Sequence, residues 1–233
     1  KPLVGVALVN LSTHEVTYLP QKKDYSAQIQ NVHIYDGNVY YTYDYNDVKI
    51  DYFSLDMSLP ETQEYLKDHS FAEIYCYDME KKTETCIFSE RRSSVLAFSE
   101  NVCLIRDFSS TSTECLFCID LSTGKKAKLV EENNISGSSY VDGQRWLYST
   151  DTDNGWKMKY VDLQTNQAYD IGQEMNVSTP YSFRDAYILG DLVYIFYTDP
   201  QSSEYCYGYL DKTDFYDGKF EKLVPLMYPN RNN

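Results

Sequence analysis

The residues of this chain that are best suited to chemistry are acids and aromatic rings that stand together where apolar runs end. An aromatic face can stack on a sugar ring or a cation, and a carboxylate beside it accepts hydrogen bonds or balances positive charge. Such groups occur near positions 44, 107, 151 and 199. We therefore predict ligand-binding side chains at Tyr43, Asp44, Tyr45, Asp107, Phe108, Asp151, Asp153, Trp156 and Asp199.

A structural interpretation of the same residues stays open. An aspartate that follows a strand can accept hydrogen bonds from the loop amides after it, and this local capping needs no ligand. Tyrosine, with 24 of 233 residues, recurs in two alternating triplets, at 41-43-45 and 205-207-209. Alternation puts each triplet on one strand face, where the rings either pack in a core or form an exposed stacking platform. We expect the exposed rings to include Tyr43, Tyr45 and Trp156.

Motifs for metal, cofactor and nucleophilic chemistry are missing from the sequence. There is no G-x-S-x-G elbow, Walker loop or HExxH pair, and the histidines at 14, 33 and 69 are far apart. The segment from Asp151 to Trp156 departs from a calcium loop, which needs glycine at its sixth position. We therefore predict no metal, no cofactor and no catalytic residue. Two carboxylates brought together by folding are the alternative, as in a glycoside hydrolase or lyase.

The six cysteines do not have the spacing of a zinc site. Cys76 and Cys86 are symmetric about one predicted hairpin turn, and Cys103 and Cys115 about another. Cysteines directly opposite each other on neighbouring strands are close but seldom have relaxed disulfide geometry. Disulfides and buried free thiols therefore both stay open.

A phrase that recurs along the chain indicates which elements position these residues. It consists of a strand, a polar turn and a second strand, and the residue that ends its first strand is Asn10, Asp78, Asp120, Asp162 or Asp211. The intervals from 78 to 120 and from 120 to 162 are 42 residues each, the length of one four-stranded propeller blade. Before the phrase, the repeat has a short apolar strand, then a tight turn and then a longer apolar strand. Each repeat thus supplies four antiparallel strands.

The repeats predict an all-β fold, a β-propeller-like array of four-stranded antiparallel blades in a single domain of residues 1–233. Four full blades are expected at about 31–88, 92–130, 137–172 and 181–224, and residues 3–19 add an outer hairpin, which makes about five blades in total. Either the fifth blade is short or its inner strands precede this sequence.

One segment of the first full blade interrupts the period. Ser58 and Glu61 have the spacing of a capping box, and Pro60 suits the first turn of a helix. We predict a short helix inserted near 58–68, preceded by an extra strand at 49–55.

The chain is strongly acidic, with 21 Lys and Arg against 35 Asp and Glu and a formal net charge of −14. Such a surface repels phosphates and anionic lipid headgroups, so we exclude nucleic acid as a partner. No segment has the roughly 20 apolar residues that cross a bilayer, so we expect no membrane insertion. The sequence begins Lys1-Pro2 without methionine, from which we expect a mature or excised segment of an exported protein.

The repeats DGNVYYTYD at Asp36 and LFCIDLSTGKKAKL at Leu116 resemble those of TolB-like and related uncharacterised bacterial propeller domains, over about residues 31–224. The resemblance implies an exported or lipid-anchored protein, often an interaction scaffold, and implies no particular ligand. We therefore expect an extracellular or cell-envelope propeller, without enzymatic activity, that binds a protein or a glycan. A glycoside hydrolase or lyase fragment and a purely structural module of a larger surface protein are the alternatives.

Overall fold

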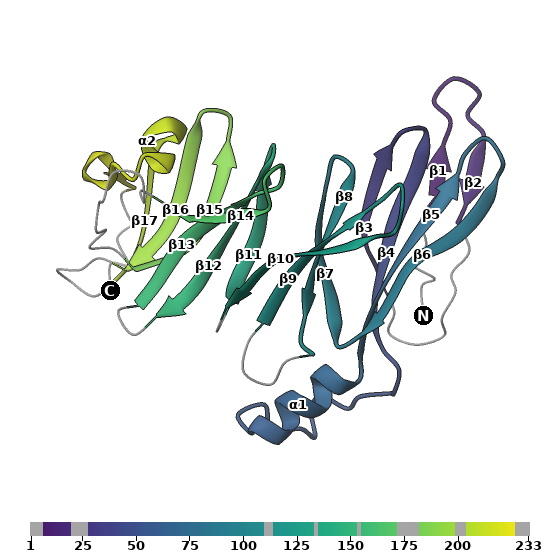
Figure 1. Cartoon of the computed structure of the whole chain (residues 1–233), viewed down its shortest axis with the longest axis horizontal. Helices are drawn as coiled ribbons and strands as arrows, with labels where there is room; N and C mark the ends of the chain where they lie inside the picture. Colours follow the sequence, from purple (N-terminus) through teal and green to yellow (C-terminus); the bar gives the residue numbers. More distant parts are fainter. Residues whose placement is uncertain are drawn as a thin grey trace, which may run out of the picture. The chain divides into compact units, whose positions relative to one another are not determined.

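Sheets of four strands that follow one another in chain order make up most of the structure (Figure 1). The computed structural model describes residues 7–19, 28–109, 114–132, 135–152, 155–171, 182–198 and 204–226. The first sheet contains β3 (Gln28–Tyr35), β4 (Asn38–Asn46), β5 (Ser70–Asp78) and β6 (Thr83–Arg91). The second contains β7 (Ser93–Ser99), β8 (Val102–Asp107), β9 (Glu114–Asp120) and β10 (Lys126–Glu132).

The other strands complete the pattern that the repeats predict. The third sheet contains β11 (Ile135–Asp142), β12 (Arg145–Thr152), β13 (Gly155–Asp162) and β14 (Gln167–Asp170). The fourth contains β15 (Ser182–Leu189), β16 (Leu192–Thr198), β17 (Tyr205–Asp211) and β18 (Val224–Pro225). The N-terminal hairpin pairs β1 (Ala7–Val9) with β2 (Val16–Tyr18). The predicted all-β array of four-stranded blades with an added hairpin is confirmed.

The recurring aspartate of the repeat shapes the outer turn of each blade. Asn10, Asp78, Asp120 and Asp162 each accept hydrogen bonds from the amides two and three residues ahead, at 2.8–3.1 Å. A side chain that caps its own turn holds the chain in the reversal between two strands. This local mechanism explains why the same residue type returns at the same place in the repeat.

The inserted helix is present, but the elements predicted around it differ. Helix α1 spans Pro60–Asp68. The predicted capping box is wrong, because Leu59 is the N-cap and Ser58 donates its hydroxyl hydrogen bond to Asp56 at 2.6 Å. The extra strand expected at 49–55 is also wrong, since this stretch consists of turns and bends.

The last sheet departs from the regular blade after β17. Asp211 accepts a hydrogen bond of 2.8 Å from the Thr213 amide and so caps a helix, α2 (Lys212–Tyr216), where the other blades have a turn. A 3₁₀ turn, η2 (Phe220–Lys222), follows. The outer strand β18 is therefore only two residues long.

The chain divides into two compact units, Lys1–Ser109 with Phe117–Ala127, and Ser110–Leu116 with Lys128–Asn233. In the first unit, Ile74 of β5 and Ile105 of β8 belong to one buried cluster, while Tyr41 on the opposite face of the first sheet clusters with Leu8 of the hairpin. In the second unit, one cluster joins Leu147 of β12 to Val193 of β16. Each unit thus buries apolar sheet faces against neighbouring sheets, as stacked blades do.

All six cysteines are present as thiols. A bulge between Ile74 and Tyr75 shifts the register of β5 and β6, so that Cys76 lies opposite Thr85 and Cys86 opposite Tyr75. The two cysteines are therefore not directly opposite. The alternative of thiols holds, but the expectation that they are buried is wrong for Cys86, which is exposed.

Candidate ligand-binding site

A hollow of about 320 Å³ lies at the end of β4 and the starts of β5 and β7. Two of the predicted binding residues, Asp44 and Tyr45, are in its wall. Its described lining residues are Asp44, Tyr45, Asn46, Tyr52, Ser70, Phe71, Ser93 and Ser94. The hollow has the size of a small ligand site and suits one side chain or one sugar ring.

Tyr45 and Phe71 form the aromatic wall of the hollow, and both rings are held in place. The ring centroids are 5.3 Å apart in a stacked arrangement, and the Arg91 guanidinium lies 5.0 Å from the centroid of Phe71. The Tyr45 hydroxyl donates a hydrogen bond of 2.9 Å to Glu73, a buried residue that also accepts one of 2.8 Å from Tyr75. Because the two rings are already fixed, binding of a ligand does not cost the entropy of ordering them.

Asp44 is the one carboxylate in the described lining of the hollow. Its two oxygens both accept the backbone N–H of Val95 in β7, at 3.0 and 3.2 Å. Burial raises the pKa of Asp44 to about 6, although this hydrogen bond lowers it in part. A carboxyl group with a raised pKa in the wall of a hollow is a candidate functional group.

Asn46 and Asp47 join the hollow to the inserted segment. Asn46 donates a side-chain hydrogen bond of 2.9 Å to the hydroxyl of Tyr52. Asp47 contacts Nδ1 of His69 at 2.6 Å and Nη2 of Arg91 at 2.7 Å. These contacts place Tyr52, from the insertion, at the rim of the hollow.

Arg92 ties α1 to the neighbouring strands. Its guanidinium donates hydrogen bonds to Glu64 at 2.6 Å and to Asp68 at 2.5 Å, both on α1. Its Nε donates another of 2.8 Å to the carbonyl oxygen of Phe108, whose ring centroid is 5.8 Å from Nζ of Lys67. Phe108 thus lies beside α1 and not in the lining of the hollow, and its binding role stays a prediction.

Asp107 is the last residue of β8, the second strand of the second sheet, and Asp44 lies near the end of β4, the second strand of the first sheet. The surroundings of the two aspartates differ. Asp107 is only 5% exposed and contacts Lys126 Nζ at 2.7 Å and the Ser109 amide at 2.7 Å. Burial raises its pKa, but the ion pair and these hydrogen bonds outweigh burial and hold the pKa below its ordinary value. The bond from the Ser109 amide is the local capping that the structural interpretation describes, and Lys126 satisfies the carboxylate as well, while a binding role of Asp107 stays a prediction.

Tyr43 does not belong to an exposed surface either. Its side chain is 1% exposed and makes edge-on contacts with Tyr41 and Tyr75, at centroid distances of 5.9 and 5.7 Å. The expectation that this ring is exposed is wrong, because Leu8 of the hairpin packs against the cluster that contains it. Tyr45, at the end of the same strand face, is only partly buried.

The remaining predicted residues belong to the third and fourth sheets. The backbones of Asp151 and Trp156 lie opposite each other in the pairing of β12 with β13. Asp153 and Asp199 lie outside the described residues, so their binding role stays a prediction.

The second tyrosine triplet forms a half-exposed aromatic surface on the fourth sheet. Tyr205 and Tyr207 are 51% and 53% exposed, and their centroids lie 5.5 and 4.9 Å from that of Phe196 on β16. The ring centroids of Tyr209 and Tyr194 are 6.0 Å apart. The alternating rings thus face outward here, whereas the triplet of β4 is mostly buried.

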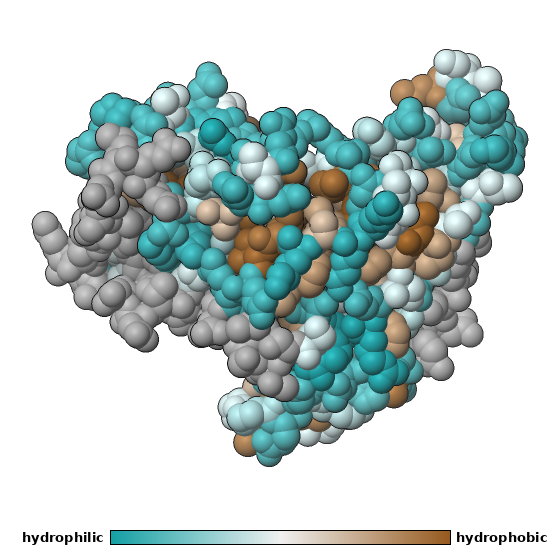
Figure 2. Space-filling view, viewed as in Figure 1, coloured by the Kyte–Doolittle hydropathy of each residue, from teal (hydrophilic) through white to brown (hydrophobic). Residues whose placement is uncertain are grey.

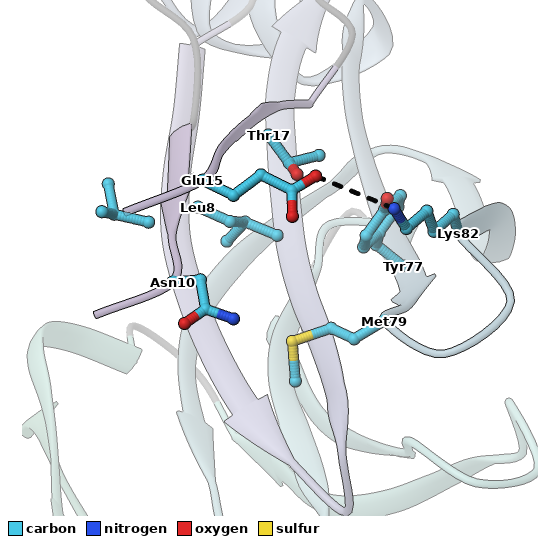
Figure 3. A pocket seen from close by; sticks show the side chains of 8 residues that line it. Leu8, Asn10, Glu15, Thr17, Tyr77, Met79 and Lys82 are labelled. Atoms are coloured by element: carbon cyan, nitrogen blue, oxygen red, sulfur yellow. Dashed lines mark ion pairs between the residues drawn. The ribbon is translucent and has the colours of Figure 1, made fainter. Parts of the chain in front are cut away.

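Two further hollows lie elsewhere in the structure. One of about 250 Å³ separates the N-terminal hairpin from the turn after β5, where Glu15 and Lys82 face each other at 3.9 Å (Figure 3). The other, of about 530 Å³, includes Arg145 and Tyr216, whose guanidinium and ring centroid are 4.2 Å apart. In the second of these, Lys212 pairs with Asp142 at 2.5 Å and Asp217 with Lys219 at 2.6 Å.

In the described part of the chain, no three His, Cys, Asp or Glu side chains are placed to hold a metal ion together. No described helix is long and apolar enough to span a membrane.

Several residues of the hollow were not predicted from the sequence, namely Tyr52, Ser70, Phe71, Ser93 and Ser94. Ser93 and Ser94 begin the inner strand of the next blade, and stacking of successive blades brings that strand beside the end of β4. The sequence signal for this contact is the boundary between the first two predicted blades, at residues 88 and 92.

Comparison with known proteins identifies the class of fold. No family model matches the chain, and no curated protein matches it. Acylaminoacyl peptidase of Pyrococcus horikoshii is similar in structure, with a TM-score of 0.55 and 12% identity over 96% of this chain and 35% of the peptidase. TolB from Acinetobacter baumannii has a TM-score of 0.51 and 12% identity over 96% of this chain and 48% of TolB.

An oligogalacturonate lyase in complex with manganese has a TM-score of 0.57 and 9% identity, over 91% of this chain and 58% of the lyase. The chain therefore spans about a third to somewhat over half of the length of these proteins. At such identities the likeness concerns the fold. The chain is a β-propeller module, and TolB is among the structures that share its architecture.

Proposed function

We propose that this chain is a binding module of an extracellular or cell-envelope protein, and that it holds a protein or a glycan in the hollow at Asp44 without carrying out a reaction. The observation that carries the proposal is the composition of that hollow. Its described lining combines the Asp44 carboxylate with Tyr52 and three serines, and the stacked rings of Tyr45 and Phe71 line it from the opposite face of the same end of the sheet. Aromatic faces and carboxylates next to hydroxyl groups recognise sugars and cationic side chains.

The arrangement of acids favours binding over catalysis. A glycoside hydrolase needs two carboxylates about 5–9.5 Å apart that flank the bond to be cleaved. In its described lining the hollow has the single carboxylate of Asp44, and Asp47, which follows the lining residue Asn46, is engaged by His69 and Arg91. A hydrolase or lyase remains the competing function, and a turnover assay on polysaccharides tests it.

A thermal-melt screen with glycans and short peptides tests binding. A ligand at 100 times its Kd adds about 2.7 kcal/mol of stability, or a rise in Tm of roughly 5–10 °C. Replacing the half-exposed rim ring, Tyr52→Ala, should reduce that rise. The matched control is Tyr18→Ala, since Tyr18 is 77% exposed on the N-terminal hairpin. Flat melts, or equal shifts for both variants, contradict the proposed site and favour a structural module.

The aromatic surface of the fourth sheet supports a second candidate, a glycan-stacking platform. Tyr207 is half exposed and packs on Phe196. If glycans bind there, Tyr207→Ala abolishes their effect on Tm while Tyr52→Ala leaves it unchanged. The opposite pattern assigns glycan binding to the hollow.

The proposed location rests on the resemblance of the repeats to TolB-like exported domains. Fractionation of cells that produce the full-length protein tests it directly. Recovery of the protein in the cytoplasmic fraction contradicts an envelope or extracellular role.

A further inference from the structure

We infer that the hollow at Asp44 takes a primary ammonium group, presented by a lysine side chain on an apolar peptide segment of a partner protein. This inference rests on the proposed function, because it names the ligand of the same hollow. It comes from a comparison of Asp44 with the other partly buried acids of the chain.

Three of those acids have a cationic partner within the protein, and buried Glu73 accepts hydrogen bonds from the hydroxyl groups of Tyr45 and Tyr75. Asp107 pairs with Lys126 at 2.7 Å, Asp142 with Lys212 at 2.5 Å and Glu132 with Lys159 at 2.7 Å. Among the residues that the structure describes, Asp44 has no such ion pair, and its carboxylate meets a single backbone amide, that of Val95. A carboxylate has about four lone-pair sites. Asp44 can therefore accept further hydrogen bonds, and it does so from the wall of an open hollow.

The surroundings of Asp44 match the geometry of an ammonium group better than that of a guanidinium. An ammonium is a compact charge with three donors on a flexible apolar stem, whereas a guanidinium is a planar fork suited to two-point pairing. Ser93 and Ser94 are also in the described lining, and the Ser93 hydroxyl donates to the carbonyl oxygen of Glu90 at 2.8 Å. The ring of Tyr52, whose hydroxyl is bonded by Asn46, suits the stem and the charge of a lysine.

The rim indicates a peptide as the source of the ammonium group. Beyond Tyr52, the insertion carries Phe53, whose side chain is fully exposed, and Met57 and Leu59, at 46% and 40%. Figure 2 shows a mostly hydrophilic surface around α1 with separate apolar groups. Phe53 directly follows Tyr52 of the lining, and an exposed apolar ring there fits a lysine flanked by an apolar residue. The net charge of −14 favours a cationic partner. An amino sugar would use the hollow but not these side chains.

Binding of this kind depends on pH. The charged and titratable groups around Asp44 include the Cys103 thiol of β8, which burial keeps protonated, and the rim set of Asp47, His69 and Arg91. In the same row of the sheet, Glu90 of β6 lies opposite Ala72 and is paired with Lys126 at 2.6 Å. From β5 and β7, the residues next to Asp44 are Ala72 and Val95, which carry no charge. Loss of the Asp44 proton is thus the change that prepares the hollow for a cation.

The test is an NMR titration of the 233-residue chain with the peptide acetyl-Phe-Lys-Leu-amide and with the same peptide acetylated at the lysine. We expect shifts at the amides of Ser94 and Val95, and a Kd at least tenfold weaker for the acetylated peptide, which has lost its charge. We also expect the affinity to fall roughly tenfold from pH 7.5 to pH 5. Absence of binding at 10 mM peptide, or equal affinities for the two peptides, overturns the inference.

Two variants of equal charge change locate the effect. Asp44→Asn should weaken binding of the lysine peptide at least tenfold. The control Asp36→Asn removes an acid from the turn at the opposite end of β4, where Asn suits the positive φ of 46°, and should bind as the wild type does. Equal affinity of Asp44→Asn and the wild type contradicts the inference even if Tyr52→Ala weakens binding, an outcome that leaves the proposed site standing. Binding of glucosamine without binding of the peptide overturns the peptide as the source.

Discussion

Two hydrogen bonds of opposite direction join Arg92 and Phe108. The Phe108 amide donates to the carbonyl oxygen of Arg92 at 2.6 Å, and Nε of Arg92 donates to the carbonyl oxygen of Phe108 at 2.8 Å. The same guanidinium holds Glu64 and Asp68 of α1. One side chain therefore connects the inserted helix, the end of the first blade and the end of β8.

The first prediction concerns this connection. Arg92→Ala should lower the free energy of unfolding by about 1–3 kcal/mol, because charge-assisted hydrogen bonds are lost and the partners on α1 are only half exposed. Amide exchange on α1 should speed up. Urea unfolding and hydrogen exchange measure both effects. Lys81→Ala is the control, since its side chain is 74% exposed, and equal losses for the two variants would show that the connection does not stabilise the fold.

The second prediction concerns the buried pair of Asp107 and Lys126. Lys126→Met should destabilise the protein by about 3 kcal/mol at pH 7, because it leaves a buried carboxylate without its cation. The folded pKa of Asp107 is depressed, so its contribution is present above the unfolded pKa and is lost as pH falls through the folded one. The gap between variant and wild type should therefore narrow in acid. Urea unfolding at pH 7 and pH 3 measures it, and the double variant with Asp107→Asn should recover much of the loss.

The third prediction is the opposite behaviour of Asp44. Its folded pKa, about 6, lies above the unfolded value, so the folded state binds the proton more tightly. The stability from this group is fully present below the unfolded pKa and is lost as pH rises through 6. Asp44→Asn keeps an acceptor for the Val95 amide and should raise the free energy of unfolding at pH 7 by about 3 kcal/mol at most.

Urea unfolding at pH 7 and pH 4 checks this sign. The difference between Asp44→Asn and the wild type should be large at pH 7 and small at pH 4. Asp36→Asn serves as the control and should show little change at either pH. A variant that is less stable than the wild type at pH 7 contradicts the assignment.

The fourth prediction compares two glycines with similar backbone angles. Gly124 has φ +68° and a Cβ there would lie 2.8 Å from the carbonyl oxygen of Ile87, whereas a Cβ at Gly143, with φ +58°, meets nothing within 4 Å. Both alanine variants incur the left-handed penalty of about 1–2 kcal/mol. Only Gly124→Ala adds a backbone clash, so its Tm should fall further. Equal Tm values for the two variants would show that the chain around Ile87 yields without cost.

The fifth prediction concerns the thiols. Ellman's reagent should titrate all six cysteines of the unfolded, unreduced chain. In the folded protein Cys86, which is exposed, should react fast, and Cys103, fully buried with a raised pKa, should react only on unfolding. Cys86→Ser should remove the fast phase, with Cys103→Ser as the control that leaves it. Fewer than six thiols in denaturant would indicate a disulfide.

Local features of the sequence predicted most of the architecture. Each blade is a run of alternating strands, and the side chain of Asp120 bonds the amides two and three residues ahead of it. Such interactions join residues that are close in the sequence, so the repeat by itself was enough to predict the four sheets and the hairpin. The strand predicted at 49–55 and the capping box predicted at Ser58 and Glu61 were wrong because these patterns are also purely local. Neither pattern shows which partners the folded chain supplies from elsewhere.

The candidate site depended on interactions of longer range. Asp44 and Asp107 come from the same position of the repeat, and sequence alone assigned them the same role. Lys126, 19 residues after Asp107, satisfies one of them, while the other meets the amide of Val95, 51 residues away. Sequence thus determined the blades and the position of both aspartates. Which of the two keeps a carboxylate toward an open hollow is decided by partners from other strands, which only the tertiary structure brings into contact.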